Sequence, residues 1–199
     1  MMTRAVFRAL GRARIPILTI ALTYSVGVTV GIIMVHAGNE FALSYRDNVV
    51  ANSRSNPALI ALEKGERLQA AILDFGQNLL LGAVPTSIGG LAVVVPYPVV
   101  AYSGWVGGIV SVNNAQISRL ANPSTATYYI SVLILQLTPY SLTGGAGVNL
   151  GLAYLRPQAP YQGEKWFGLP KEAVRDLLRI YLLAMPLFLI ASLFEFLLT

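Results

Sequence analysis

The sequence has little of what water-soluble enzymes usually depend on. It contains no cysteine and a single histidine, His36, which excludes disulfides, thiolate nucleophiles and metal sites built from cysteine or several histidines. Only 12% of the residues are charged, whereas a soluble domain carries roughly a quarter. Because 55% of the residues are hydrophobic, the composition is typical of an integral membrane protein.

Basic residues outnumber acidic ones, with 14 lysines and arginines against 9 aspartates and glutamates. In a soluble protein the resulting net charge of +5 would suggest nucleic acid as a partner. Here the basic residues flank apolar runs, a pattern typical of headgroup contact and of topology setting. We therefore expect membrane lipids with anionic headgroups as partners, and no nucleic acid.

Three arginines recur every four residues in the basic segment 1–14. Arg4, Arg8 and Arg12 would form one stripe on a helix, which predicts headgroup contact by a short interfacial helix. A disordered basic tail that only sets the topology is the alternative.

The uncharged stretch 15–35 is long enough to cross a hydrocarbon core of about 30 Å. It exceeds the ~7–15 apolar residues of a signal peptide, so we expect a transmembrane helix.

About five transmembrane helices are expected, in a single all-α membrane domain that covers residues 1–199. The polar segments 38–70 and 156–175 are expected to flank the membrane. The five apolar segments are residues 15–35, 71–95, 99–112, 128–155 and a last one that ends at Thr199.

Prolines are expected to interrupt the third and fourth of these segments. Pro96 and Pro98 should break the helix before the third segment, because proline lacks an N–H donor and restricts the residue before it. Pro139 lies inside the fourth, which would be about 42 Å long as a straight helix. For that segment one kinked helix is favoured over two half-helices.

Local signals predict helices in both polar segments. Asn56 followed by Pro57 is typical of an N-cap and a first helical residue. Glu63 and Arg67 are spaced for an ion pair on a helix that runs into the second span, although Gly65 weakens it. Pro170 is expected to open the last helix, with i,i+3 ion pairs among Glu172, Arg175, Asp176 and Arg179. Tyr161, Trp166 and Phe167 suit the aromatic belt of a membrane interface.

An odd number of spans puts the chain ends on opposite sides, and the basic residues favour a cytoplasmic N-terminus in the cell (plasma) membrane. The expected inner side holds Arg4, Arg8, Arg12, Arg14, Arg156, Lys165, Lys171 and Arg175. The expected outer side holds Arg46, Arg54, Lys64, Arg67 and Arg119.

Pairs of glycines four residues apart lie in three of the apolar segments. Such GxxxG pairs let helix backbones approach closely in lipid. They predict either packing within the chain, favoured because a bundle needs close contacts, or an interface with a partner or second copy. The pairs are Gly27 with Gly31, Gly104 with Gly108, and Gly147 with Gly151.

Isolated polar residues at membrane depth are expected to serve structure. Asp74 and Glu195 lie near the ends of spans, where anchoring at the interface is favoured over a proton or ion relay. Gln77, Asn78 and Gln136 are expected to form hydrogen bonds between helices.

No catalytic, cofactor-binding or metal site is predicted. A serine triad would need His36 as its base, and nothing in the sequence places this residue against a serine and an acid. No glycine-rich phosphate loop follows a strand. We therefore expect that the protein is not an enzyme and uses no cofactor.

Three stretches combine glycines with isolated polar residues. They are Phe75-Gly76-Gln77-Asn78-Leu79 leading through Gly89-Gly90 to Ser103-Gly104-Trp105, then Thr138-Pro139-Tyr140-Ser141 leading to Gly151, and residues 193–199 with Glu195. In these stretches the chain resembles the stage II sporulation protein M family of integral membrane proteins. The resemblance covers the layout of residues 15–199 and gives Asn78 and Glu195 as polar residues of the family motif.

The chain departs from that family at three positions. Tyr140 and Ser141 replace the family's histidine and glycine after the proline, and Gly144 stands where a glutamate is expected. Members of the sporulation branch are membrane scaffolds for cell-wall remodelling complexes, so the resemblance implies assembly rather than a reaction.

Two functions from different classes are therefore expected. The first is a non-catalytic scaffold or accessory subunit that binds other membrane subunits, or a second copy, through its glycine-rich faces. The second is a small transporter or channel that uses discontinuous helices. A cavity lined by Gln136, Thr138 and Asn149 would favour the second.

Overall fold

The computed structural model describes residues 2–113, 115–157 and 159–198 and is almost wholly helical, which confirms the all-α class. A short antiparallel hairpin, β1 (Lys165–Trp166) and β2 (Leu169–Pro170), precedes the last helix. The helices are α1 (Met2–His36), α2 (Glu40–Ser53), α3 (Pro57–Glu63), α4 (Arg67–Gln77), the π-helix η1 (Asn78–Ala83), α5 (Val84–Gly89), the 3₁₀ turn η2 (Gly90–Ala92), α6 (Pro96–Ile109), α7 (Pro123–Leu155) and α8 (Lys171–Leu197).

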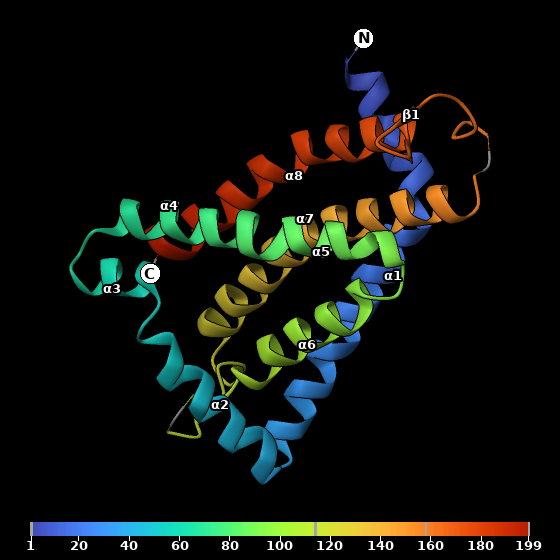
Figure 1. The fold of residues 1–199 in the computed structure, drawn as a ribbon. Coiled ribbons are helices and arrows are strands. Elements are labelled where there is room, and N and C mark those ends of the chain that lie inside the picture. Colours follow the sequence, from blue (N-terminus) through green and yellow to red (C-terminus); the bar gives the residue numbers. More distant parts are fainter. Residues whose placement is uncertain (1, 114, 158, 199) are drawn as a thin grey trace.

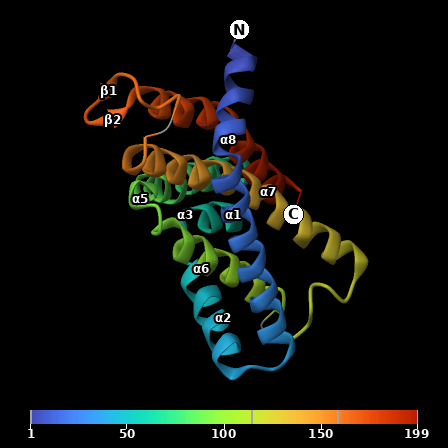
Figure 2. The same ribbon diagram turned by 90° about the vertical axis from the view of Figure 1, so that its right-hand side faces the viewer.

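The second half of α7 is the centre of the bundle. Every residue from Ser141 to Gly151 is buried, and this stretch is rich in small side chains. A helix that is buried all round needs small residues on several faces, because neighbours approach it from every side. Figure 1 shows α8 and the α4–α5 run beside α7, while α1 crosses them and α6 lies along α1; Figure 2 gives the same arrangement from the side.

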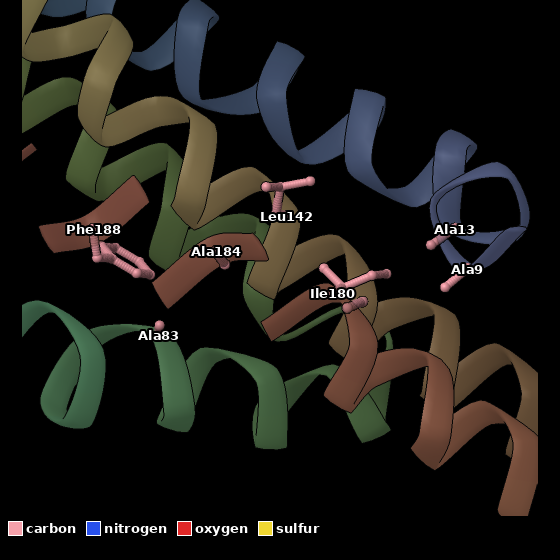
Figure 3. Packing of buried hydrophobic residues seen from close by; sticks show 8 residues of the cluster. Ala9, Ala13, Ala83, Leu142, Ile180, Ala184 and Phe188 are labelled. Carbon is pink, nitrogen blue, oxygen red and sulfur yellow. The ribbon is translucent and has the colours of Figure 1, made fainter. Parts of the chain in front are cut away.

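Alanines and one aromatic ring join four of these helices. Figure 3 shows Ala9 and Ala13 of α1 near Ile180 of α8, with Ala184 and then Phe188 further along α8. The cluster is completed by Ala83, Leu142 and Ala146. Small side chains on α1 and α8 let the two helices cross closely, as expected for helices that pack without much bulk between them.

The helix ends gather in separate clusters. Near the start of α1, the ends of α5 and α7 meet the start of α8: Gly90 packs on Gly147, and Ala153 packs with Ala173. The other helix ends form two separate clusters: one contains the end of α1 with α2 and the end of α6, and the other contains α3 and the start of α4 with the end of α8. Figure 1 shows α8 and the α4–α5 run lying beside α7, with α1 passing across them at a steep angle.

Two helices in the described part of the chain, α1 and α8, are long and apolar enough to cross a membrane. Five membrane-spanning helices were expected, and two of the described helices meet this requirement of length and apolar composition. The expectation is therefore confirmed only in part. The expected second span, 71–95, is divided among α4, η1, α5 and η2, and the third corresponds to the 14-residue α6. The fourth is one uninterrupted helix, α7, which has glycine, serine and threonine among its apolar residues.

The expected break before the third segment is present, but it lies just ahead of the prolines. Pro96 and Pro98 lie in the first turn of α6, where a missing N–H costs nothing because those donors have no helical partner. The chain turns just before them, at Val93, which has a φ of 60°. Pro139 lies inside α7 without ending it, which confirms one helix over two half-helices for this segment. Neighbouring Thr138 and Thr143 donate their hydroxyls to carbonyls within the helix.

The basic segment 1–14 is the first part of α1 and not a separate helix or tail. In the segment 38–70, Asn56 caps α3 and accepts from the Ala58 N–H, as predicted. The predicted helix through Glu63 and Arg67 is instead divided at Gly65, whose φ of 82° ends α3 and starts α4.

Candidate functional site

A cluster of polar side chains joins α4, η1, α7 and α8, and we call its six members the polar cluster. Asp74 accepts hydrogen bonds from Ser192 Oγ at 2.7 Å and from Asn78 Nδ2 at 2.8 Å. Tyr140 donates its hydroxyl to Asn78 Oδ1 at 2.8 Å. The remaining members, Gln136 and Glu195, are joined by an amide-to-carboxylate hydrogen bond of 2.9 Å.

The two carboxylates of the polar cluster are held by neutral donors. Asp74 and Glu195 are close enough to interact electrostatically. Within the described part of the chain neither forms an ion pair, and hydroxyl and amide groups supply their hydrogen bonds. A half-buried carboxylate without a basic partner is costly to ionise, so these two residues mark a candidate functional site.

A groove of about 650 Å³ opens beside this cluster, and we call it the α6 groove. One wall is the face of α6 and its approach, from Val95 to Val110; the other is η1 and α5 between Leu81 and Thr86. Asn78, Gln136 and Tyr140 of the polar cluster line it, and none of its described lining residues is charged. The side-chain amides of Asn78 and Gln136 line the groove and are hydrogen-bonded to the carboxylates of Asp74 and Glu195 behind it.

The π-helix η1 shapes the wall next to Tyr140. A side chain at Gly82 would overlap the Tyr140 ring, so glycine at this position leaves room for the tyrosine. Short π-helical segments are frequent at functional sites because they redirect side chains. Here the π-helix brings Asn78 and Gly82 to the same tyrosine.

A second charged cluster lies at the opposite end of the bundle. Asp176 is completely buried and accepts from Arg12 Nε at 2.6 Å, from Arg179 at 2.9 Å and from the Tyr161 hydroxyl at 3.0 Å. Burial raises the pKa of the Tyr161 phenol, so this residue remains a neutral donor, and it accepts in turn from Asn149. We regard this cluster as structural, because its groups satisfy one another.

The predicted GxxxG glycines all pack within the chain. Gly27 and Gly31 of α1 face α6, where a side chain would meet the backbone of Ala101, Trp105 and Gly108. Gly104 and Gly108 face α1 in return, and Gly147 and Gly151 face α5 and η2. The interpretation as intrachain packing is therefore confirmed, and these six positions are not free to bind a partner.

The predicted headgroup arginines separate into two kinds. Arg4 and Arg8 are exposed on α1, as headgroup contact requires. Arg12 instead binds Asp176 and Glu172, because α8 crosses α1 at this point. The predicted ion pairs within α8 are present, at 3.7 Å between Arg175 and Glu172 and at 2.9 Å between Arg179 and Asp176.

Of the residues that would favour a transport cavity, only Gln136 lines the α6 groove. Thr138 is exposed elsewhere on α7, and Asn149 is buried against Tyr161. The family-motif residues Asn78 and Glu195 both belong to the polar cluster, where Asn78 binds Asp74 and Tyr140 and Glu195 binds Gln136. Sequence reasoning missed Asp176 as a buried charge and the pairing of Asp74 with Glu195, because both depend on contacts between distant segments.

The His36 side chain does contact a serine, Ser118, in the structure. Its Nε2 lies 2.8 Å from Ser118 Oγ, and its Nδ1 lies 2.8 Å from the Ile32 carbonyl oxygen. The group behind the imidazole is therefore a backbone carbonyl and not an acid, and Ser118 Oγ also accepts from the Leu120 N–H. His36 is exposed, and these contacts tie the α6–α7 loop to the end of α1.

Comparisons with protein-family models, curated proteins and solved structures found no match to this chain. The family resemblance stays an expectation that rests on the three sequence stretches.

Proposed function

We propose that this protein is a multi-pass protein of the cell membrane, with a cytoplasmic N-terminus, that serves as a non-catalytic scaffold or accessory subunit of a larger membrane complex. Membrane insertion is supported by the apolar stretches of α1 and α8, of which only 22% and 28% is buried in the bundle. Ile15, Leu18 and Leu22 of α1 are each about two-thirds exposed. A core helix of a soluble protein would bury these faces.

Five passes fit the way in which the helix ends gather. If α1 crosses outward, the run from Arg67 to Ala92 crosses back, and α6, α7 and α8 then alternate. This order puts the start of α1 and the α7–α8 loop on one side, in keeping with the ion pair between Arg12 and Glu172. The basic residues expected on the cytoplasmic side belong to those two regions.

The α6 groove is the observation that carries the role as a subunit. One face of α6 is closed onto α1 by Gly104 and Gly108, whereas the opposite face has Val99 44% and Tyr102 51% exposed. That face is about 22 Å long between Val95 and Val110, most of the thickness of a hydrocarbon core. A groove of this shape accommodates a transmembrane helix of a partner.

The lining of the groove indicates the chemistry of that helix. It is largely apolar and holds no charged residue among those described, so a charged helix face would be buried there without a counter-ion. Its polar members are neutral: Asn78, Gln136, Thr86, Ser103 and the tyrosines Tyr24, Tyr102 and Tyr140. A matching partner helix carries small apolar residues and one neutral hydrogen-bonding side chain. Interhelical hydrogen bonds of this kind contribute about 1 kcal/mol in membranes.

Site-directed photo-crosslinking tests the proposal, since the chain has no native cysteine. Ser103→Cys places a benzophenone maleimide in the groove, and Ser25→Cys on α1 is the matched control. Both serines are exposed and donate to the carbonyl four residues earlier. In native membranes we expect Ser103→Cys to label one membrane protein that also co-purifies in a fixed ratio, and Ser25→Cys to label lipid.

Filling the groove should remove that product. Val106→Trp adds bulk to the groove wall and is expected to abolish both the crosslink and the co-purification. Equal labelling at the two positions, or an adduct that persists when the groove is filled, would contradict the role as a subunit.

A transporter or channel is a second candidate, favoured by one observation. Asn78 and Gln136 line the groove and bind Asp74 and Glu195 behind it, an arrangement suited to passing a proton or cation from the groove to a carboxylate. Purified protein in proteoliposomes should then show a flux that Glu195→Gln abolishes. The absence of flux together with a defined partner at Ser103 would exclude this candidate.

A further inference from the structure

The β1–β2 hairpin presents an aromatic residue at a costly position. Phe167 and Gly168 form the turn with φ angles of 50° and 83°, a geometry that favours asparagine and glycine. A bulky residue rarely adopts a positive φ. The Phe167 side chain is nevertheless fully exposed, so no contact within the described chain compensates for it. This residue is therefore suited to contact something outside the chain.

Basic groups surround the neighbouring tryptophan. The Lys171 ammonium lies 5.3 Å, and the Arg175 guanidinium 5.6 Å, from the centre of the Trp166 ring, which is 42% exposed. Exposed tryptophan beside lysine and arginine is the composition of a membrane interface. The hairpin and the first turns of α8 thus resemble a headgroup-level anchor.

Arg175 is the arginine of this region whose charge is least neutralised by a carboxylate. Three arginines, Arg12, Arg175 and Arg179, share the two carboxylates of Glu172 and Asp176. Arg12 and Arg179 form close hydrogen bonds, whereas Arg175 is 3.7 Å from Glu172 and almost half exposed. With Lys171 and its partner Glu164 included, four basic groups share three carboxylates, and Arg175 is the most exposed of the four. The excess positive charge is therefore most accessible at Arg175.

An apolar groove begins at the same arginine. It has a volume of about 470 Å³ and runs along α8 over Leu178, Leu182 and Met185, which are 40% to 55% exposed. Arg175 and Arg179 form its charged end. An anionic group at one end and a long apolar chain along the rest would complement it.

We infer that this surface binds an anionic phospholipid, with the phosphate at Arg175 and an acyl chain along Leu178 and Leu182. Trp166 and Phe167 lie beside the headgroup. The inference rests on the membrane insertion proposed above, and it adds a lipid class and a binding site to it. Charge complementarity favours an anionic lipid over a zwitterionic one by about fivefold for a single arginine.

Tryptophan quenching by brominated lipids tests the site. Trp105→Phe leaves Trp166 as the single tryptophan of the two in the chain. This variant is reconstituted in phosphatidylcholine that contains brominated phosphatidylglycerol or, in a parallel sample, brominated phosphatidylcholine. We expect stronger quenching by the anionic lipid, and a loss of about fivefold in that preference in Arg175→Gln.

Two further variants keep the result interpretable. Arg175→Lys retains the charge and is expected to retain the preference, and Lys64→Gln removes an exposed charge near the other end. Equal quenching by the two lipids, or a preference that survives Arg175→Gln, would overturn the lipid site. Carbonate extraction reads membrane insertion separately: protein that is extracted refutes the proposed topology, whereas retained protein without a lipid preference refutes this inference alone.

Discussion

At the scale of single residues, the chain holds its interior carboxylates in two different ways, with Asp176 fully buried and Asp74 and Glu195 half-buried. Asp176 is surrounded by the guanidinium groups of Arg12 and Arg179, and its charge is balanced where it is formed. Asp74 and Glu195 receive only neutral donors. The first arrangement fixes the crossing of α1 on α8, and the second leaves groups whose charge remains available to a ligand or partner.

Asp176→Asn should destabilise the protein strongly. The substitution keeps the shape of the side chain but leaves Arg12 and Arg179 without a balancing charge in a buried contact, at a cost of about 3 kcal/mol. Unfolding in mixed detergent micelles measures this change. Glu164→Gln, which removes the partner of Lys171 at an exposed position, is the control and should leave the midpoint unchanged. Similar midpoints for both variants would refute the structural role of Asp176.

Tyr140→Phe tests the polar cluster. It removes the hydroxyl that donates to Asn78 and leaves that acceptor facing the groove, for an expected loss of about 1 kcal/mol. Tyr154→Phe is the matched control, because Tyr154 is 52% exposed on the same helix. If the two variants unfold at the same detergent concentration, the Tyr140 hydroxyl contributes nothing to stability.

At the scale of elements, α6 shows how one short helix serves two surfaces. Its glycines let it approach α1 so closely that a side chain at Gly108 would overlap the Val28 carbonyl. Its opposite face keeps the larger side chains and lines the α6 groove. Because the helix is held firmly on one side, the groove on the other has a fixed shape, which favours a specific occupant.

Two glycine-to-alanine substitutions should have opposite effects. Gly108→Ala forces α1 and α6 apart and should cost about 1–3 kcal/mol, as overpacking does. At Gly76 in α4 a methyl group meets nothing within 4 Å, so Gly76→Ala should stabilise the helix by about 0.5–1 kcal/mol. The same micelle unfolding assay measures both. A change of equal sign at the two positions would contradict the packing described for α1 and α6.

At the scale of the whole molecule, the loops divide between two ends of the bundle. The α2–α3 connection lies at the end that also holds the start of α4, and the α7–α8 loop lies at the end that holds the start of α1. A membrane across the long helices would therefore separate these two loops. The apolar faces of α1 and α8 would lie within it.

Cysteine accessibility in intact cells checks this topology. Ser55→Cys and Gln162→Cys place single thiols in the two exposed loops of a chain without native cysteine. An impermeant maleimide should label Ser55→Cys in intact cells and Gln162→Cys only after permeabilisation. Labelling of both thiols from the same side would rule out five passes.

Much of the local structure could be predicted from the sequence because its causes are local. An asparagine followed by proline, as at Asn56 and Pro57, is a helix N-cap signal that does not depend on the rest of the fold. In the same way, charged residues spaced i,i+3, as in α8, can pair on any helix. The all-α class follows from long apolar runs with few charges. The break near Pro96 and Pro98 was also predictable, but its exact position was not, because both prolines fall in the first turn of α6, where they are tolerated.

The candidate site could not be predicted in the same way, because its members come from distant segments. Asp74 and Ser192 are 118 residues apart, and Gln136 and Glu195 are 59 apart. The sequence alone determined that the chain is helical, apolar and rich in glycines that allow close contact, since these properties belong to single residues and their near neighbours. Only the tertiary structure decided that those glycines face one another, that Asp176 is buried, and that a groove remains beside α6, because each depends on which helices meet.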